Sequence, residues 1–182
     1  CASIATGGLV IAVNFPANAL AQKGIVEHTS VNLNAFIHLE ENGDTVIYCG
    51  RCEMGQGIST ALPSAVADEM EADWQRVTVK QGDADEKFGP QATGGSASIR
   101  LMYQPMREAG ATAKAMLIAA AAKVWKTSPD NCFAQAHFII NKTNQQKLGY
   151  GQLASNAANM PIPKKLKLKK KSDFNYIGKK LP

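Results

Sequence analysis

Polar and apolar residues alternate from Asn34 to Leu39, which is the period of a half-buried β-strand. The turn signal Asn42-Gly43-Asp44 follows, and the next segment, Thr45–Cys49, is again rich in β-branched and aromatic residues. Two strands joined by a turn of this kind form a β-hairpin. The pattern therefore predicts a hairpin at the front of the folded region.

A helical period begins after a glycine-interrupted loop over residues 50–57. Ser59 or Thr60 is a suitable N-cap, and Pro63 belongs in a first helical turn, so a helix is expected to start near residues 61–62 and to end near Ala72. The apolar positions at helical spacing are Leu62, Ala65, Val66 and Met70.

The rest of the chain continues to mix strands and helices. A strand is expected over residues 74–81, a long loop over 83–98, and a helix over 105–125. A short strand over 137–141 and a short helix over 151–159 follow. The sequence therefore predicts an α/β protein of the α+β kind, with a mixed sheet, a front hairpin and packed helices.

The first 15 residues are apolar and uncharged but too short to span a membrane. Together with the small residues at 17–21, they favour an export-signal remnant over residues 1–21 and a periplasmic location. The alternative is an ordinary buried strand or helix in a protein that stays in the cytoplasm. No other segment is predicted to span a membrane.

The composition indicates a globular core and one basic segment. Hydrophobic residues make up 45% of the chain and charged residues 19%, which excludes a disordered protein. The net charge is +5, but six lysines fall within residues 164–171, and without them it would be −1. Residues 161–182 therefore suggest a Lys/Pro-rich linker or surface strap. Polyanion binding through Lys164–Lys171 is a weaker alternative, and nucleic acid is not expected because no aromatic residues interleave with the lysines.

The cysteines leave two alternatives open. Cys49 and Cys52 form a C-x-x-C, which suits a redox pair or half of a zinc site. No second C-x-x-C follows, and the pair ends a strand pattern, whereas a redox pair usually opens a helix. Packing is therefore the favoured interpretation, and no metal ligands are predicted.

Two glycine-rich loops stand ahead of predicted helices, Glu53–Gly57 and Ala92–Ser98. The first turn of a helix offers unpaired N–H groups and the positive end of the helix dipole, and glycines let a ligand approach the backbone closely. Such loops suit a phosphate or another anion. The side-chain amide of Gln56 both donates and accepts, which suits the edge of a heterocycle. The usual nucleotide-binding fingerprints are absent.

The stretch Glu53-Met-Gly-Gln-Gly-Ile-Ser-Thr60 resembles the E-M-G-Q-G-x-x-T motif of molybdopterin-binding large subunits in the xanthine dehydrogenase/aldehyde oxidase family. The second loop, Thr93–Ser98, lies at the separation that this family shows. Three further runs look like the branch of isoquinoline 1-oxidoreductase beta subunits: residues 67–74, 91–100 and 174–182.

The resemblance implies the cofactor-binding part of a molybdenum hydroxylase that oxidises an N-heterocycle or aldehyde with water as oxygen source. It places a partial cofactor-binding domain at residues 34–160 and a linker to a following domain after it. The implied cofactor is molybdopterin with molybdenum, in the cytosine dinucleotide form. The residues implied to bind it are Met54, Gly55, Gln56, Gly57, Gly94, Gly95, Ser96, Ala97 and Ser98.

No catalytic residue is expected in this chain, because the glutamate that serves as general base in the family lies near the end of a much longer subunit. Neither Glu53 nor Glu69 takes its place. The implied partners are the remainder of the large subunit, a small subunit that carries [2Fe-2S] clusters, and a cytochrome c as electron acceptor. A non-catalytic binding or assembly module of the same branch remains the alternative.

Overall fold

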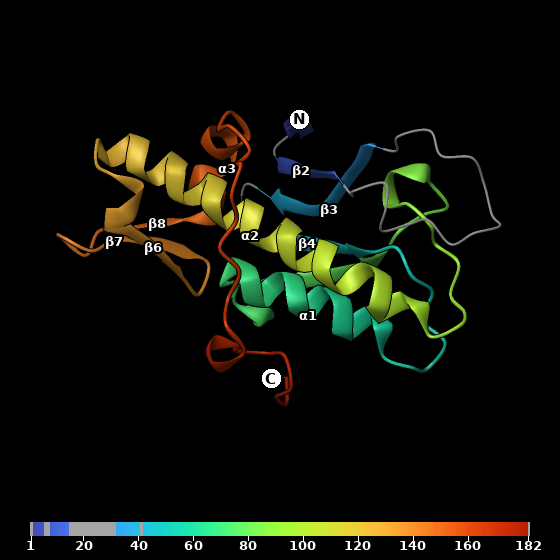
Figure 1. The fold of residues 1–182 in the computed structure, drawn as a ribbon. Coiled ribbons are helices and arrows are strands. Elements are labelled where there is room, and N and C mark those ends of the chain that lie inside the picture. Colours follow the sequence, from blue (N-terminus) through green and yellow to red (C-terminus); the bar gives the residue numbers. More distant parts are fainter. Residues whose placement is uncertain (1, 6–7, 15–31, 41, 182) are drawn as a thin grey trace.

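The computed structural model describes residues 2–5, 8–14, 32–40 and 42–181, with side chains from residue 36 onward. A five-stranded sheet, in the order β1-β2-β3-β4-β5, lies behind two long helices (Figure 1). A smaller three-stranded sheet, β6-β7-β8, lies beside the C-terminal part of the longer helix. The mixed sheet and packed helices confirm the predicted α+β class.

The elements have the following bounds. The large sheet contains β1 Ala2–Ala5, β2 Gly8–Asn14, β3 Asn32–Glu40, β4 Thr45–Cys49 and β5 Val77–Gln81. The small sheet contains β6 Cys132–Gln135, β7 Phe138–Asn141 and β8 Lys147–Gly149. The helices are α1 Ile58–Met70, α2 Ala97–Trp125 and α3 Tyr150–Ala158. Short 3₁₀ turns cover Trp74–Arg76, Glu86–Phe88, Pro129–Asn131 and Lys171–Asp173.

The predicted hairpin is present. Strands β3 and β4 pair antiparallel, with Ile37 opposite Ile47, and the backbone of Glu40 bonds to that of Asp44 across the turn. In front of the hairpin, residues 2–5 and 8–14 form two further antiparallel strands of the same sheet. For this segment the sequence left two alternatives open, an export signal and an ordinary strand or helix. Residues 1, 6, 7 and 15–21 of the predicted signal lie outside the described residues.

The predicted start and cap of the first helix were wrong. Helix α1 begins at Ile58, and its N-cap is Gly57 in the left-handed region, with no side-chain bond from a cap residue. Ser59 and Pro63 both lie inside the helix. Ser59 does not cap the helix, because its N–H and hydroxyl both donate to the carboxylate of Glu53, which lies outside the helix.

Helix α2 begins eight residues earlier than predicted, at Ala97 rather than Pro105. Pro105 lies in the helix interior, although proline cannot donate the i→i−4 bond there. The earlier start shortens the predicted loop and brings the helix directly onto the glycine-rich segment. The short helix predicted over 151–159 is α3, and the strand predicted over 137–141 is β7. The strand predicted over 74–81 opens with a 3₁₀ turn before β5.

The β4–α1–β5 connection determines where the site can form. Strands β4 and β5 are parallel neighbours, with Thr45 opposite Val77 and Cys49 opposite Gln81. Parallel strands that lie side by side end at the same edge of a sheet. The loop after β4 leads to α1, and the loop after β5 leads to α2, so both glycine-rich loops leave the sheet at one edge.

Helices α1 and α2 pack tightly against each other and against the sheet. A Cβ atom on Gly110 would lie 2.5 Å from the carbonyl oxygen of Val66, so the two backbones approach too closely for any larger residue. The core side chains beneath them include Ile37, Leu39, Ile47, Leu62, Val66, Met70, Met106, Met116, Leu117 and Leu153.

Residues 161–181 cross the outer face of both helices as a strap (Figure 1). The buried carboxylate of Asp68 accepts from the Lys169 side chain at 2.8 Å and from the backbone N–H groups of Asn175, Tyr176 and Ile177 at 2.8–3.0 Å. The segment is thus a strap, as one of the two predicted alternatives had it, and the side chain of Lys169 is buried in its contact with Asp68.

Candidate cofactor-binding site

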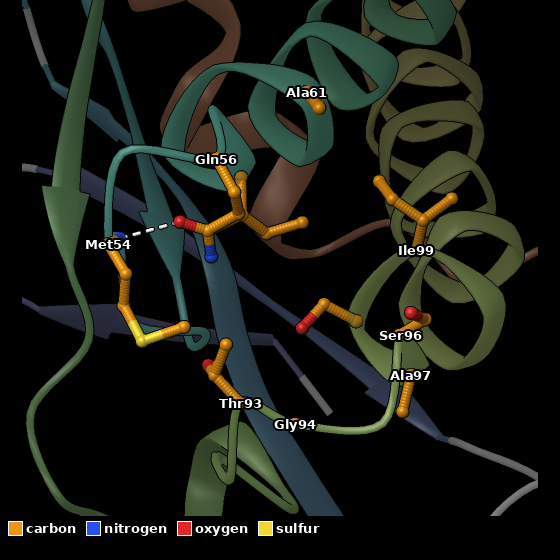
Figure 2. A pocket seen from close by; sticks show the side chains of 10 residues that line it. Met54, Gln56, Ala61, Thr93, Gly94, Ser96, Ala97 and Ile99 are labelled. Carbon is orange, nitrogen blue, oxygen red and sulfur yellow. Dashed lines mark hydrogen bonds between the residues drawn. The ribbon is translucent and has the colours of Figure 1, made fainter.

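Both predicted loops face one hollow of about 420 Å³ (Figure 2). The first loop and the start of α1 form one wall, and the second loop and the start of α2 form the other. The walls are mostly apolar, and the side chains of Met54 and Ile99 are 70% and 44% exposed at its rim. The lining residues are Met54, Gln56, Ile58, Ala61, Thr93, Gly94, Ser96, Ala97, Ser98 and Ile99.

Glu53 organises the first loop. Its Oε1 accepts from the N–H of Gly55 at 2.8 Å and of Gly57 at 2.9 Å, and its Oε2 accepts from the N–H and hydroxyl of Ser59. These bonds, those of Ser59 first, lower the pKa of Glu53 to about 2. A carboxylate of the chain itself therefore occupies the N-terminus of α1, where the sequence suggested that an external anion could bind.

Gln56 also serves the first loop. Its Oε1 accepts from the N–H of Met54 at 2.6 Å (Figure 2). Its Nε2 donates to the carbonyl of Cys52 at 2.9 Å. An amide group has two donor hydrogens and two acceptor lone pairs, so one of each remains for a ligand. The left-handed backbone of Gly55 and Gly57, at φ 91° and 80°, completes this tight turn.

Phe88 anchors the long segment that precedes the second loop. Its ring packs against Phe36 and Tyr48, each at 5.7 Å between centroids, on strands β3 and β4. A Cβ atom on Gly82 would lie 2.9 Å from that ring, so a glycine is needed there. The side chain of Gln91 bonds to the backbone at both Asp83 and Asp85. These contacts fix the segment without regular secondary structure.

Two hydrogen bonds tie the loops to each other. The backbone N–H of Cys52 donates to the hydroxyl of Thr93 at 3.0 Å, and Nη1 of Arg51 donates to the carbonyl of Ala92. Each bond joins positions 41 apart in the sequence. The two loops are therefore held at a set separation across the hollow.

The N-terminus of α2 is open. The N–H of Ala97 bonds to the carbonyl of Gly94 at 3.1 Å, but in the part of the chain that the structure describes, no hydrogen bond uses the N–H of Ser98 or Ile99. A Cβ atom on Gly94 or Gly95 would meet nothing within 4 Å. Free N–H groups, hydroxyls and an unobstructed glycine backbone are the donor set that an anionic group requires.

The structure thus brings most of the predicted residues together. Met54, Gln56, Gly94, Ser96, Ala97 and Ser98 line the hollow, whereas Gly55, Gly57 and Gly95 shape the loops without lining it. The sequence missed Ile58, Ala61, Thr93 and Ile99, which complete the walls. The helical spacing of Ile58 with Ala61 was a usable signal once the helix start was known.

The three cysteines that the structure describes form no disulfide and no metal cluster. Cys49, Cys52 and Cys132 are free thiols, and Cys49 is buried where β4 ends. Burial raises the pKa of Cys49, which disfavours a reactive thiolate. Among the described residues, no group of three or more metal-ligating side chains is found, and no helix is both long and apolar enough to cross a bilayer.

Comparisons with known proteins identify the family of the chain. The family described as molybdopterin cofactor-binding domain matches residues 6–180. The chain is 35% identical over 142 residues to a membrane-bound aldehyde dehydrogenase [pyrroloquinoline-quinone] of Gluconacetobacter polyoxogenes, a match that covers 75% of this chain and 18% of that protein. It is 32% identical over 134 residues to isoquinoline 1-oxidoreductase subunit beta of Brevundimonas diminuta, covering 70% and 17%.

Solved structures share the fold. Quinoline 2-oxidoreductase from Pseudomonas putida 86 matches with a TM-score of 0.55 at 12% identity, over 69% of this chain and 16% of that one. The chain thus spans less than a fifth of the length of the relatives it matches. It belongs to the molybdopterin cofactor-binding domain family, within the xanthine dehydrogenase/aldehyde oxidase group that its E-M-G-Q-G motif indicated.

Proposed function

We propose that this chain forms one side of the cofactor cradle of a molybdenum-dependent hydroxylase. The observation that carries the proposal is that two loops, from the ends of neighbouring parallel strands, face one hollow with an open helix N-terminus on one wall. The donor set fits an anionic heterocycle, because N–H and hydroxyl donors lie on one wall and apolar side chains on both.

The two walls would contact different parts of the cofactor. Backbone N–H groups at the start of α2, with the hydroxyls of Ser96 and Ser98, would hold the anionic part of the pterin cofactor. Met54 and Ile99 would exclude water from its ring system, and the remaining donor and acceptor of Gln56 would meet the ring edge. The bound cofactor would supply molybdenum, which accepts two electrons from the substrate. No residue of this chain is assigned to proton transfer.

The proposal also covers the form of the cofactor, the substrate class and the partner subunits. The cytosine dinucleotide form would place a second phosphate near the open N-terminus of α2. Relatives are named as subunits that act on isoquinoline or nicotinate, or as an aldehyde dehydrogenase, which supports an N-heterocycle or aldehyde as substrate. A small [2Fe-2S] subunit and then a cytochrome c would receive the electrons.

The test is to isolate the protein with every chain that co-purifies and to measure molybdenum, extractable pterin and pyrroloquinoline quinone. The name of one relative specifies that quinone, so both cofactors must be assayed. The proposal expects about one molybdenum and one pterin per chain. Quinone without molybdenum would contradict it, and a loaded complex that oxidises no heterocycle or aldehyde would favour an assembly module.

We also propose that the protein works in the periplasm, on the strength of the uncharged apolar residues 1–15 and the small residues that follow. Mass spectrometry of the mature N-terminus in fractionated cells tests this. A periplasmic chain that begins near residue 22 would support export by a cleaved signal. If the chain is instead found in the cytoplasm and retains residues 2–14, these residues are strands of the sheet and not part of a signal.

A further inference from the structure

Arg51 lies in the loop between β4 and α1, and its side chain is almost entirely buried, at 2% exposure. Its Nη1 donates to the carbonyl of Ala92 in the segment that leads into the second loop. Its Nε and Nη2 are buried and have no hydrogen-bond partner among the described residues. These are the sole buried side-chain nitrogens or oxygens in the described part of the chain that lack one.

Such an arrangement is costly for a guanidinium. The group carries five N–H donors and stays charged at any physiological pH, and a buried charge without a partner destabilises the folded state. The ion pairs formed by the described residues involve Arg76, Lys87, Arg107 and Lys169, but not Arg51. The titratable groups that interact with it are the thiols of Cys49 and Cys52, and burial lowers the pKa of Arg51.

The position of this charge connects it to the hollow. Ala92 precedes Thr93 and Gly94, which line the hollow, and the N–H of Cys52, next to Arg51, donates to the hydroxyl of Thr93. Arg51 therefore contacts the residue directly before the lining residues of the second loop, although it does not line the hollow itself. Glu53, the nearest acid along the chain, has both carboxylate oxygens engaged with the first loop and α1.

We propose that Arg51 is a positioning residue of the cofactor site that also supplies the counter-charge for an anionic group of the cofactor. It fixes the second loop through Ala92, and its unpaired charge makes that side of the hollow favourable for a phosphate. The cofactor in turn offsets the cost of the buried charge. The inference rests on the proposed function, and it assigns to Arg51 a role that the E-M-G-Q-G motif does not include.

A purely structural role predicts a different response to substitution. If Arg51 only braced the loop, its removal would lower stability and cofactor retention together. If it is a counter-charge, Arg51→Met removes an unfavourable buried charge from the cofactor-free protein and a favourable one from the loaded protein. Stability without cofactor then stays level or rises, while cofactor retention falls.

The experiment compares Arg51→Met, Arg51→Lys and the control Arg76→Met in the intact assembly. Arg76 forms a partly exposed ion pair with Asp44 at 3.1 Å, so its loss removes the same charge away from the loops. Molybdenum and pterin per chain are measured after dialysis, and the melting temperature is measured before and after the cofactor is stripped.

Arg51→Met is expected to weaken cofactor retention roughly tenfold or more, as for the loss of one charge-assisted interaction, without lowering the melting temperature of the stripped protein. Arg51→Lys keeps the charge and should retain most of the cofactor. Arg76→Met should leave retention unchanged. A parallel fall of retention and stripped-state stability in Arg51→Met would overturn the proposal, as would full retention. Failure of the proposed function can be told apart from failure of the Arg51 proposal, because in that case the wild-type protein itself would contain no molybdenum or pterin.

Discussion

Asp68→Asn should release the strap from helix α1. The carboxylate is fully buried, and its oxygens accept from the Lys169 ammonium and from three backbone N–H groups of the strap. An asparagine presents one NH₂ group in place of an oxygen, so two of these four donors would face another donor. The buried Lys169 would also lose one of its two carboxylate partners, the other being Glu71.

Breaking a buried charge pair by removing one partner costs about 3–5 kcal/mol, and the unsatisfied donors belong to the same network. We expect the free energy of unfolding to fall by that amount in urea titrations followed by tryptophan fluorescence. Trp74 is a suitable probe, because its ring lies 5.9 Å from that of Tyr176 in the strap. A loss under about 1 kcal/mol would refute the assignment of Asp68 as the buried anchor site.

Asp85→Asn is the matched control. Asp85 also pairs with a lysine, Lys87 at 3.0 Å, but both side chains are exposed, and asparagine can replace aspartate as the cap of the short turn that follows. No measurable change in stability is expected there.

Acid should narrow the difference between wild type and Asp68→Asn. Burial acts to raise the pKa of Asp68, but the hydrogen bonds from Asn175, Lys169, Ile177 and Tyr176 outweigh it, so the pKa lies below the ordinary 3.8. The contribution of the carboxylate is therefore present above about pH 3.8 and is lost as the pH falls below it. The free energies of unfolding of wild type and Asp68→Asn are compared at pH 7 and well below pH 3.8. An equal difference at both pH values would contradict the role of the Asp68 carboxylate.

Three further predictions concern other parts of the fold. Gly110→Ala should cost about 1–3 kcal/mol in urea unfolding, because its Cβ would lie 2.5 Å from the Val66 carbonyl; an unchanged midpoint would contradict the close helix packing. Glu53→Gln should speed hydrogen exchange at the Ser59 amide while the core amides keep their protection; unchanged exchange there would exclude Glu53 as the cap. Burial, then Arg76, lowers the pKa of His137 to about 4 from 6.5, so its neutral form should contribute ~3 kcal/mol above pH 6.5, lost as the pH falls toward 4. His137→Gln should flatten that part of the stability curve.

Features that depend on residues close together in the sequence could be predicted from it. The hairpin followed from alternation and an Asn-Gly-Asp turn, and both glycine-rich loops were located because glycines directly before a predicted helix are a local signal in the sequence. The start of α1 was missed because its cap comes from Glu53, outside the helix and six residues before Ser59. The start of α2 was missed because the predicted helix began at Pro105, whereas this proline lies inside the observed helix.

Long-range pairings could not be predicted. Lys169 looks like one of many solvated lysines in the sequence, yet it is buried because Asp68 and Glu71, about 100 positions earlier, face it. Two of the three runs that resembled the isoquinoline branch, residues 67–74 and 174–182, contact each other through Asp68 and the strap. Their contact gives a physical reason for the two runs to occur together.

The central claim is that the two loops grip one ligand together. A double-mutant cycle tests it most directly, with Gln56→Ala in the first loop, Ser98→Ala in the second, and both combined. Molybdenum and pterin retention are measured in the intact assembly, with urea stability as the control. If both loops hold the same ligand, the retention losses should be non-additive, with a coupling above about 0.5 kcal/mol, while stability changes little. Additive losses, or retention that changes only as far as stability does, would contradict the claim.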